Sequence, residues 1–318
     1  MSLAVGAAAV AAAGATVGIT LATRTPTPPA PAITSAVRSG APPLMLDLGV
    51  RTDAEATALR RALALYDDGR RASARAIFER YRSPEAAVGA ALARWPAGFA
   101  ALARLSRRLP RNPVVRLNYG IALYWRGRLA AARASWQGVR RDAPDTPYAV
   151  RAGDLLYPNY PDGLPTFVPA FRVPQRIAKL SPPRQLAALA ARARAGGEAG
   201  RLLYGVALQR LGHQVSALRQ YEAAAAAAPA DPEPRVAEAV ARFDKGDPSA
   251  TFSRLGPLAK AYPKSPSVRF HLGLCLLWLG QVKAAEQELR LARSEDADGV
   301  LGAEAKLFLD RLAAIGTK

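Results

Sequence analysis

A repeated spacing of glycines constrains this chain more than any other feature of its sequence. Gly212, Gly246 and Gly280 stand 34 residues apart, and Gly127 has the same kind of neighbours earlier in the chain. A small residue lies seven positions before each of these glycines, and a bulky residue lies nine positions after it. Such a period predicts a stack of similar short units, each packed on its neighbours, instead of one continuous core.

Each position of the repeat has a physical cause. Small residues in both halves of the unit let two antiparallel helices approach closely, and the glycine between them takes a backbone conformation that side chains penalise. The bulky residue is expected to fill the space between neighbouring helix pairs. The small residues are Gly120, Gly205, Ala239 and Gly273, the bulky ones are Trp136, Tyr221, Leu255 and Leu289, and the prolines that end second helices are Pro144, Pro229 and Pro263.

The composition favours helices throughout. The chain is 50% hydrophobic, and much of this is alanine, whereas β-branched and aromatic runs of strand length are scarce. The repeat pattern resembles the tetratricopeptide repeat (TPR) family, whose unit is a helix-turn-helix of this length. The resemblance covers residues 54–315 and implies an all-α fold, a right-handed α-solenoid. It is specific for the fold and not for a function.

One unit is too long for the period. The unit after Pro144 should begin near Pro147 and the next one near Glu198, which is 51 residues later instead of 34. We therefore expect an insertion rich in proline and aromatic residues at about residues 158–174, between helices predicted over residues 147–157 and 181–195. Three interpretations stay open: the insertion packs on the protein's own surface, contributes to a partner's binding site, or forms a mobile loop.

The N-terminus has the character of a membrane segment. Residues 3–22 are uncharged and mostly apolar, and their number, 20, matches a helix that spans a bilayer. We expect an anchor or a signal segment over residues 1–23 and a proline-rich tether over residues 24–52. An alanine-rich soluble helix is the alternative.

The sequence gives opposing signals about the side of the membrane on which the folded part lies. Arg24 and Arg38 follow the apolar run and favour a cytoplasmic domain, whereas the proline-rich stalk is typical of surface-exposed proteins. We expect a location at the cell membrane with a single N-terminal anchor, or secretion after cleavage. The folded part is expected on the extracytoplasmic side.

The chain is strongly basic, with a formal net charge of +19, and residues 51–198 carry 26 basic and 11 acidic side chains. The wealth of arginine is also typical of a GC-rich bacterial genome, which is the alternative to a selected anion-binding face. The densest cluster predicts a site for anionic lipid or a cell-envelope polyanion. It comprises Arg104, Arg107, Arg108, Arg111 and Arg116. No aromatic residues are interleaved there, which disfavours nucleic acid as a partner.

Motifs for catalysis and metal binding are missing from the sequence. The chain has two histidines, His213 and His271, and one cysteine, Cys275, with no cluster at ligand spacing. It also has no phosphate-binding loop, dinucleotide fingerprint or serine elbow. We predict a non-enzymatic protein with no catalytic residue, cofactor or metal. An enzyme with an unrecognised site is kept as an alternative.

The resemblance to TPR proteins implies that the first helices of the units form an inner surface that binds peptides. Aromatic residues concentrate binding energy at interfaces, so we expect them to make the main contacts. The predicted contact residues are Tyr124, Trp125, Phe243, Trp278, Phe270, Gln209 and Arg210. The sequence thus predicts a membrane-tethered scaffold that binds a protein or peptide on its concave face. A basic module that binds anionic lipid or a cell-envelope polymer is the alternative.

Overall fold

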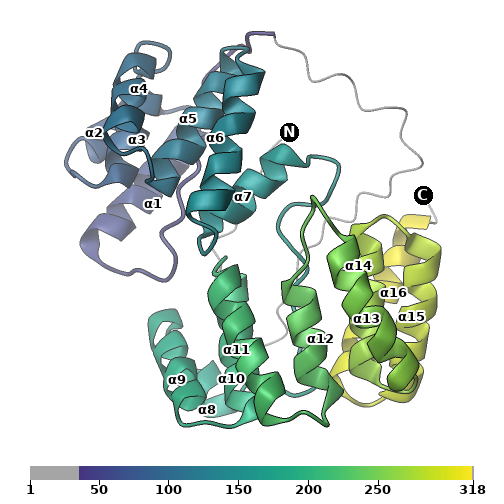
Figure 1. The fold of residues 1–318 in the computed structure, drawn as a ribbon. Coiled ribbons are helices and arrows are strands. Elements are labelled where there is room, and N and C mark those ends of the chain that lie inside the picture. The colour runs from purple at the N-terminus through teal and green to yellow at the C-terminus, as the bar shows by residue number, and fades with distance from the viewer. Residues whose placement is uncertain (1–35, 317–318) are drawn as a thin grey trace. The chain divides into compact units, whose positions relative to one another are not determined.

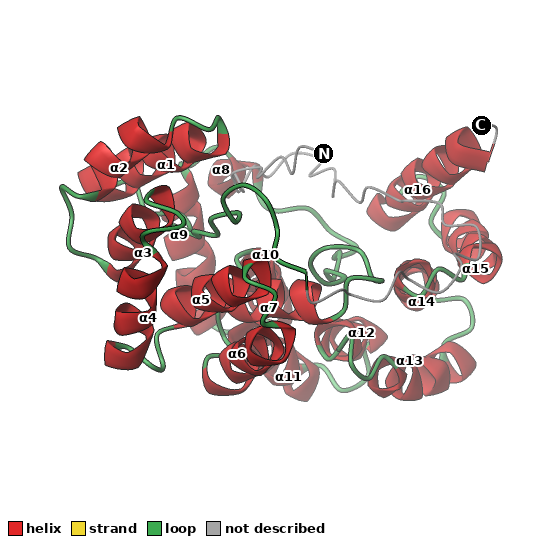
Figure 2. Ribbon diagram, turned by 90° about the horizontal axis from the view of Figure 1, so that it is seen from above, coloured by secondary structure: helices red, strands yellow, loops and turns green. Residues whose placement is uncertain are grey.

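The computed structural model describes residues 36–316, and every regular element in that range is a helix. Figure 2 shows these helices in red, joined by loops in green, with no β-strand among the described residues. The all-α prediction is therefore confirmed for this part of the chain. Residues 3–22, the predicted membrane segment, lie outside it. No helix within residues 36–316 is both long and apolar enough to cross a bilayer.

The chain forms two compact units that meet in the sequence between Leu156 and Tyr157. The N-terminal unit, residues 36–156, contains α1 (Ala54–Asp67), α2 (Arg71–Phe78), α3 (Pro84–Ala93), α4 (Phe99–Arg108), α5 (Pro113–Trp125), α6 (Leu129–Asp142) and α7 (Pro147–Leu156). The C-terminal unit, residues 157–316, contains α8 (Gln175–Ala178), α9 (Pro182–Arg194), α10 (Glu198–Arg210), α11 (Gln214–Ala227), α12 (Pro232–Ala241), α13 (Ser249–Ala261), α14 (Pro266–Trp278), α15 (Val282–Glu295) and α16 (Val300–Gly316). Figure 1 labels these helices.

Consecutive helices pack as hairpins, as the repeat predicts. α5 packs on α6, α10 on α11 and α14 on α15, and α16 lies against α14 and α15 at the end of the array. The helices on either side of the predicted insertion behave differently. α7 packs on α5 and α6, whereas α9 packs on α8 and α10, so the two belong to different compact units although the period placed them in one repeat.

Capping residues determine where the first helices of these hairpins begin. The side chains of Asn112, Asp231 and Ser265 accept hydrogen bonds from main-chain N–H groups in the first turns of α5, α12 and α14. A proline follows each cap, at a position where the helix needs no N–H donor. The residues at the start of each of these helices therefore determine where the helix begins.

The turn glycines mostly adopt the conformation that the repeat predicts. Gly127, Gly212 and Gly280 have φ values of 72°, 79° and 72°, in the left-handed region that side chains disfavour. Gly246 is an exception, since it is not among the glycines with positive φ. A Cβ atom at Gly246 would lie 2.5 Å from the hydroxyl oxygen of Tyr157, so this glycine makes room for a side chain instead.

In three repeats the bulky residue packs on the small glycine of its own hairpin. A Cβ atom at Gly120 would lie 2.4 Å from Nε1 of Trp136, and one at Gly205 would lie 2.3 Å from Cε1 of Tyr221. These bulky residues therefore contact their own hairpin, and the expectation that they also fill the space between neighbouring pairs stays a prediction. The ring lies across the first helix, and the missing side chain of the glycine provides the space for it.

We expect Gly120→Ala to destabilise the protein by about 1–3 kcal/mol, because the added methyl group overlaps Trp136 in a packed core. Gly153→Ala is the matched control in the same unit, since no atom lies within 4 Å of its added Cβ. That change should be neutral or stabilise helix α7 by up to about 1 kcal/mol. Urea unfolding of both variants measures the difference, and equal destabilisation would contradict the packing described here.

Candidate functional site

Within each compact unit, the first helices of the hairpins form one surface, here called the inner face. An extended segment of the same chain lies on this surface. In the N-terminal unit this is the N-segment, residues 36–50, which belongs to the predicted tether. Its alternating side chains Leu44, Leu46 and Leu48 are buried. The N-segment is extended, as expected for a tether, but it is packed instead of free.

Side chains from three helices hold the main chain of the N-segment. Oδ1 of Asn118 on α5 accepts a hydrogen bond from the N–H of Met45 at 2.9 Å, and its Nδ2 donates to the C=O of the same residue at 2.8 Å. The hydroxyl of Tyr148 on α7 accepts from the N–H of Asp47 and donates to its C=O, each at 3.1 Å. Tyr66 on α1 donates to the C=O of Pro42 at 2.5 Å.

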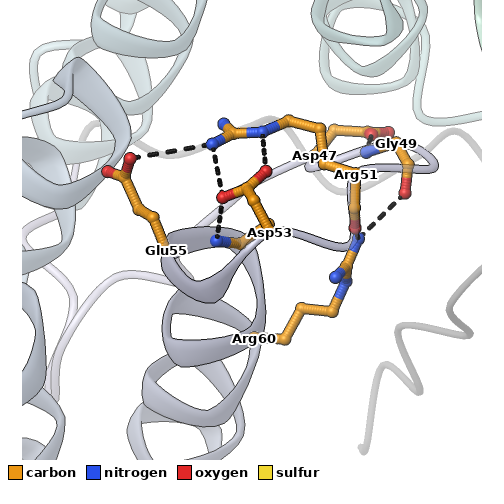
Figure 3. A network of polar contacts seen from close by, with 7 residues as sticks. Asp47, Gly49, Arg51, Asp53, Glu55 and Arg60 are labelled. Carbon is orange, nitrogen blue, oxygen red and sulfur yellow. Dashed lines mark hydrogen bonds and ion pairs between the residues drawn. The ribbon is translucent and has the colours of Figure 1, made fainter.

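A polar network joins the end of the N-segment to the start of α1, as Figure 3 shows. Nη2 of Arg60 donates to the C=O groups of Gly49 at 3.0 Å and of Arg51 at 2.7 Å. The side chain of Asp53 accepts from Arg51 at 2.9 Å and from the N–H of Ala56 at 3.0 Å. These bonds lower the pKa of Asp53 to about 2, and the one from Arg51 contributes most. The carboxylate thus stays charged as the cap of α1.

In the C-terminal unit the inner face carries the insertion segment, residues 157–174, drawn in teal in Figure 1. Phe167 at its centre has no exposed surface. Its ring stacks on His271 at 4.8 Å between centroids and meets Tyr221 edge to face at 5.6 Å. The segment therefore packs on the protein's own surface, which was one of the three interpretations open from the sequence.

A carboxamide also holds the main chain of the insertion segment. Oε1 of Gln209 on α10 accepts from the N–H of Phe167 at 3.1 Å, and its Nε2 donates to the C=O of Pro165 at 3.1 Å. The hydroxyl of Tyr221 donates to the same Oε1 at 3.0 Å. Tyr221 thereby fixes the orientation of the Gln209 carboxamide, which binds the main chain of the insertion segment.

Two further side chains contact this main chain. Nε2 of His271 on α14 accepts from the N–H of Val168 at 2.9 Å, while its Nδ1 donates to the C=O of Ser267 at 2.7 Å. Burial lowers the pKa of His271 to about 4, which keeps the ring neutral and Nε2 available as an acceptor at neutral pH. Nζ of Lys245 donates to the C=O of Pro161 at 2.5 Å.

Three carboxylates gather beside the insertion segment. Oxygen atoms of Glu198, Asp231 and Glu233 lie within 4.8 Å of one another, and among the described residues this is the one group spaced to hold a metal ion. Glu233 already accepts from the N–H of Ala170 at 2.6 Å. Burial raises the pKa of Glu233 to about 7, and the negative charges of Asp231 and Glu198 act in the same direction.

The predicted contact residues of the N-terminal unit lie beneath the N-segment. The guanidinium group of Arg38 covers the ring of Tyr124 at 3.6 Å from its centroid and donates to the C=O of Tyr124 at 3.1 Å. The N–H of Arg38 donates to the C=O of Trp125 at 2.9 Å. Both aromatic residues therefore contact the protein's own chain.

The predicted contact residues of the C-terminal unit are mostly buried. Phe243 and Trp278 are each 4% exposed and meet edge to face at 6.0 Å. Phe270 is fully buried against Phe308 of α16, and Gln209 is bound to the insertion segment as described, whereas Arg210 is exposed. Binding of a partner by these residues stays a prediction.

The predicted polyanion cluster is only partly drawn together. Arg104, Arg107 and Arg108 are exposed on α4. Arg111 lines a surface pocket of about 620 Å³ with Arg116, where Arg116 forms an ion pair with Asp142. Asp142 thus offsets part of the positive charge that the sequence counted toward this cluster.

Among the polar side chains that hold the two segments, sequence reasoning singled out Gln209 as a contact residue but missed Asn118 and Glu233. Asn118 and Glu233 sit among apolar helix positions, and their partners lie 73 and 63 residues away in the sequence. One signal was available, since Leu44, Leu46 and Leu48 alternate with other residues as a half-buried extended segment does.

Comparison with known proteins supports the repeat. A family model described as tetratricopeptide repeat matches residues 242–307. The resemblance seen in the sequence is confirmed over this stretch. Yeast Tom70 is a similar solved structure, with a TM-score of 0.31 and 11% identity over 80% of this chain and 47% of that chain. This chain thus spans about half the length of that Tom70 chain.

A second similar structure is the C-terminal part of a TPR repeat-containing protein from Cytophaga hutchinsonii. It has a TM-score of 0.29 and 12% identity, over 78% of this chain and 98% of that chain. A comparison with curated protein sequences found no match.

We expect Glu233→Gln to change how stability depends on pH. The folded-state pKa of Glu233, about 7, lies above the ordinary value of 4.5, so the folded protein holds a proton that the unfolded chain releases in this window. The free energy of unfolding of the wild type therefore falls as pH rises from 4.5 to 7. Glutamine cannot ionise, so the variant should gain stability relative to the wild type over this range, by at most about 3 kcal/mol.

Chemical unfolding at a series of pH values tests this prediction. Glu238→Gln is the control, because Glu238 lies on the same helix but pairs with Arg242 at 3.0 Å. Equal pH dependence of the two variants would contradict the role of burial at Glu233.

Proposed function

We propose that this protein is a membrane-tethered, non-enzymatic scaffold that binds a partner protein through an extended peptide on its inner face. One observation carries the proposal. Both inner faces already hold an extended segment of this chain by hydrogen bonds from side chains to main-chain groups, through Asn118 in one unit and Gln209 in the other.

Such contacts suit peptide recognition because every peptide has the same main-chain donors and acceptors, while pockets for individual side chains give selectivity. In the C-terminal unit the selective pocket is the one that Phe167 fills between His271 and Tyr221. A partner segment with an aromatic residue among prolines matches this inner face best.

The partner must take the place of the insertion segment. A segment tethered in the same chain competes at an effective concentration on the order of millimolar. Binding from solution is therefore weak while the insertion segment is in place, and it becomes measurable when the hold on that segment is weakened.

The membrane part of the proposal rests on the sequence. The apolar run at residues 3–22 supports an anchor at the cell membrane, and the proline-rich stretch after it favours an extracytoplasmic position for the repeat units. An anchored scaffold of this kind keeps its partner close to the bilayer.

We expect Phe167→Ala in the full chain to free the inner face of the C-terminal unit for a peptide added in trans. Loss of a buried phenylalanine costs about 3–5 kcal/mol of packing free energy, which weakens the hold on the insertion segment. A fluorescent peptide with the sequence of residues 157–174 should bind this variant and bind the wild type far more weakly. Fluorescence anisotropy gives both dissociation constants.

The control peptide carries alanine at the position of Phe167 and should not bind the variant. Circular dichroism checks that the variant is folded. Val168→Pro serves as a second variant, since it removes the N–H that donates to His271 and leaves Phe167 in place. Failure of the peptide to bind either folded variant would overturn the proposal.

A further inference from the structure

Four arginines line one surface pocket of the N-terminal unit. The pocket has a volume of about 540 Å³, and no carboxylate is among its lining residues. It is lined by Val37, Arg38, Gly40, Arg71, Trp95, Pro96, Arg126 and Arg128. None of these arginines belongs to the cluster that the sequence singled out.

Separate local structures bring the four guanidinium groups together. Val37 forms an antiparallel bridge with Arg126, and this bridge carries Arg38 to the end of α5. Arg126 and Arg128 flank the turn between α5 and α6. Arg71 is the first residue of α2, and its Nη1 donates to the C=O of Trp95 at 3.1 Å.

The pocket concentrates positive charge without an internal counterion. Within residues 36–316, none of the four arginines forms an ion pair with a carboxylate, and Arg126 and Arg128 are exposed. Four like charges around one space repel one another unless an anion enters it. Neutral groups of the protein hold three of the guanidinium groups: Arg38 lies on the ring of Tyr124, Arg126 on the ring of Phe99, and Arg71 donates to the C=O of Trp95. None of these groups carries the negative charge that would offset the repulsion, whereas an anion in the pocket would.

Two helix starts add to this potential. α2 and α6 begin at Arg71 and Leu129, and neither has a side-chain cap for its first N–H groups. The start of a helix carries partial positive charge, so a basic residue there is electrostatically unfavourable and an anion is favourable. Arg71 and Arg128 thus stand where helix formation alone would select against them.

The sequence shows that this placement is particular to the N-terminal unit. Arg128 directly follows the turn glycine Gly127, whereas His213, Asp247 and Gln281 take the same place in the C-terminal unit. The repeat itself does not require a basic residue at that position.

We propose that this pocket is a binding site for a phosphate group. Arginine fits a phosphate because its planar guanidinium group donates two parallel hydrogen bonds to two phosphate oxygens. Four guanidinium groups can together bind a doubly charged phosphate or a diphosphate. Trp95 and Pro96 form an apolar wall beside the charges, and the volume leaves room for the group that carries the phosphate. Two sources share this chemistry, a lipid headgroup and a soluble phosphate ester.

The test measures binding to the full chain in non-ionic detergent, with inorganic pyrophosphate as the probe in calorimetry. Arg126→Gln/Arg128→Gln removes two pocket charges from exposed side chains. It should weaken pyrophosphate binding about tenfold or more, as expected for the loss of charge-assisted bonds. Arg107→Gln/Arg108→Gln removes the same charge from exposed positions on α4 and should change binding less than about threefold, because exposed distant charges are screened.

A second arm separates the two sources. A lipid headgroup is indicated if the wild type binds vesicles of phosphatidylglycerol more strongly than vesicles of phosphatidylcholine, and if pyrophosphate or the pocket substitutions reduce this difference. Comparing the two lipids cancels the binding that comes from the apolar run at residues 3–22. Pyrophosphate binding that depends on the pocket, with vesicle binding that does not, indicates a soluble phosphate ester. Both outcomes support the site.

Equal weakening by the pocket and α4 variants would overturn the proposal, because general charge would then explain the binding. Absence of pyrophosphate binding to the wild type would overturn it as well. Circular dichroism checks the folding of both variants. If the double variant unfolds, Arg128→Gln alone replaces it, since Arg128 is exposed and precedes the first turn of α6.

Discussion

An extended chain buried against helices must find hydrogen-bond partners, because the main-chain groups of the helices are already paired with one another. In this protein, side chains supply those partners. Asn118 and Gln209 each accept from an N–H and donate to a C=O of the segment they hold, as a neighbouring strand would do in a sheet. The packing of both segments, and the burial of the inner faces beneath them, depend on these bonds.

The helix hairpins provide the frame in which such bonds form. Because Gly205 lets the ring of Tyr221 lie across α10, the hydroxyl of Tyr221 reaches Oε1 of Gln209 at 3.0 Å. The same contact that brings two helices together therefore also orients the carboxamide. In this unit Tyr221 therefore serves both the packing of the hairpin and the binding of the insertion segment.

Much of the helical frame could be predicted from the sequence because its causes are local. The turn glycines, the caps such as Asn112 and the match of Gly120 with Trp136 all follow from short spacings. The path of the two extended segments could not be predicted. Asn118 meets Met45 across 73 residues. The alternation of Leu44, Leu46 and Leu48 indicates a half-buried extended segment but not the helix on which it packs.

The arginine pocket was beyond sequence reasoning for a related reason. The density of arginine along the sequence indicated an anion site at residues 104–116. The pocket residues Arg38, Arg71 and Arg126 instead come from three distant stretches that the fold brings together. Charge counted along a sequence ignores partners such as Asp142, which pairs with Arg116.

The bonds of the N-segment also determine how it would respond to mechanical force. Its contacts follow the order of the chain, from Arg38 through Pro42 and Met45 to the network at Arg51. A pull applied at residue 36 loads these contacts one after another, as in opening a zipper, instead of shearing them all at once. The segment would thus peel away step by step, and α1 would come under tension only after the contacts of Arg38, Tyr66, Asn118 and Tyr148 had been released.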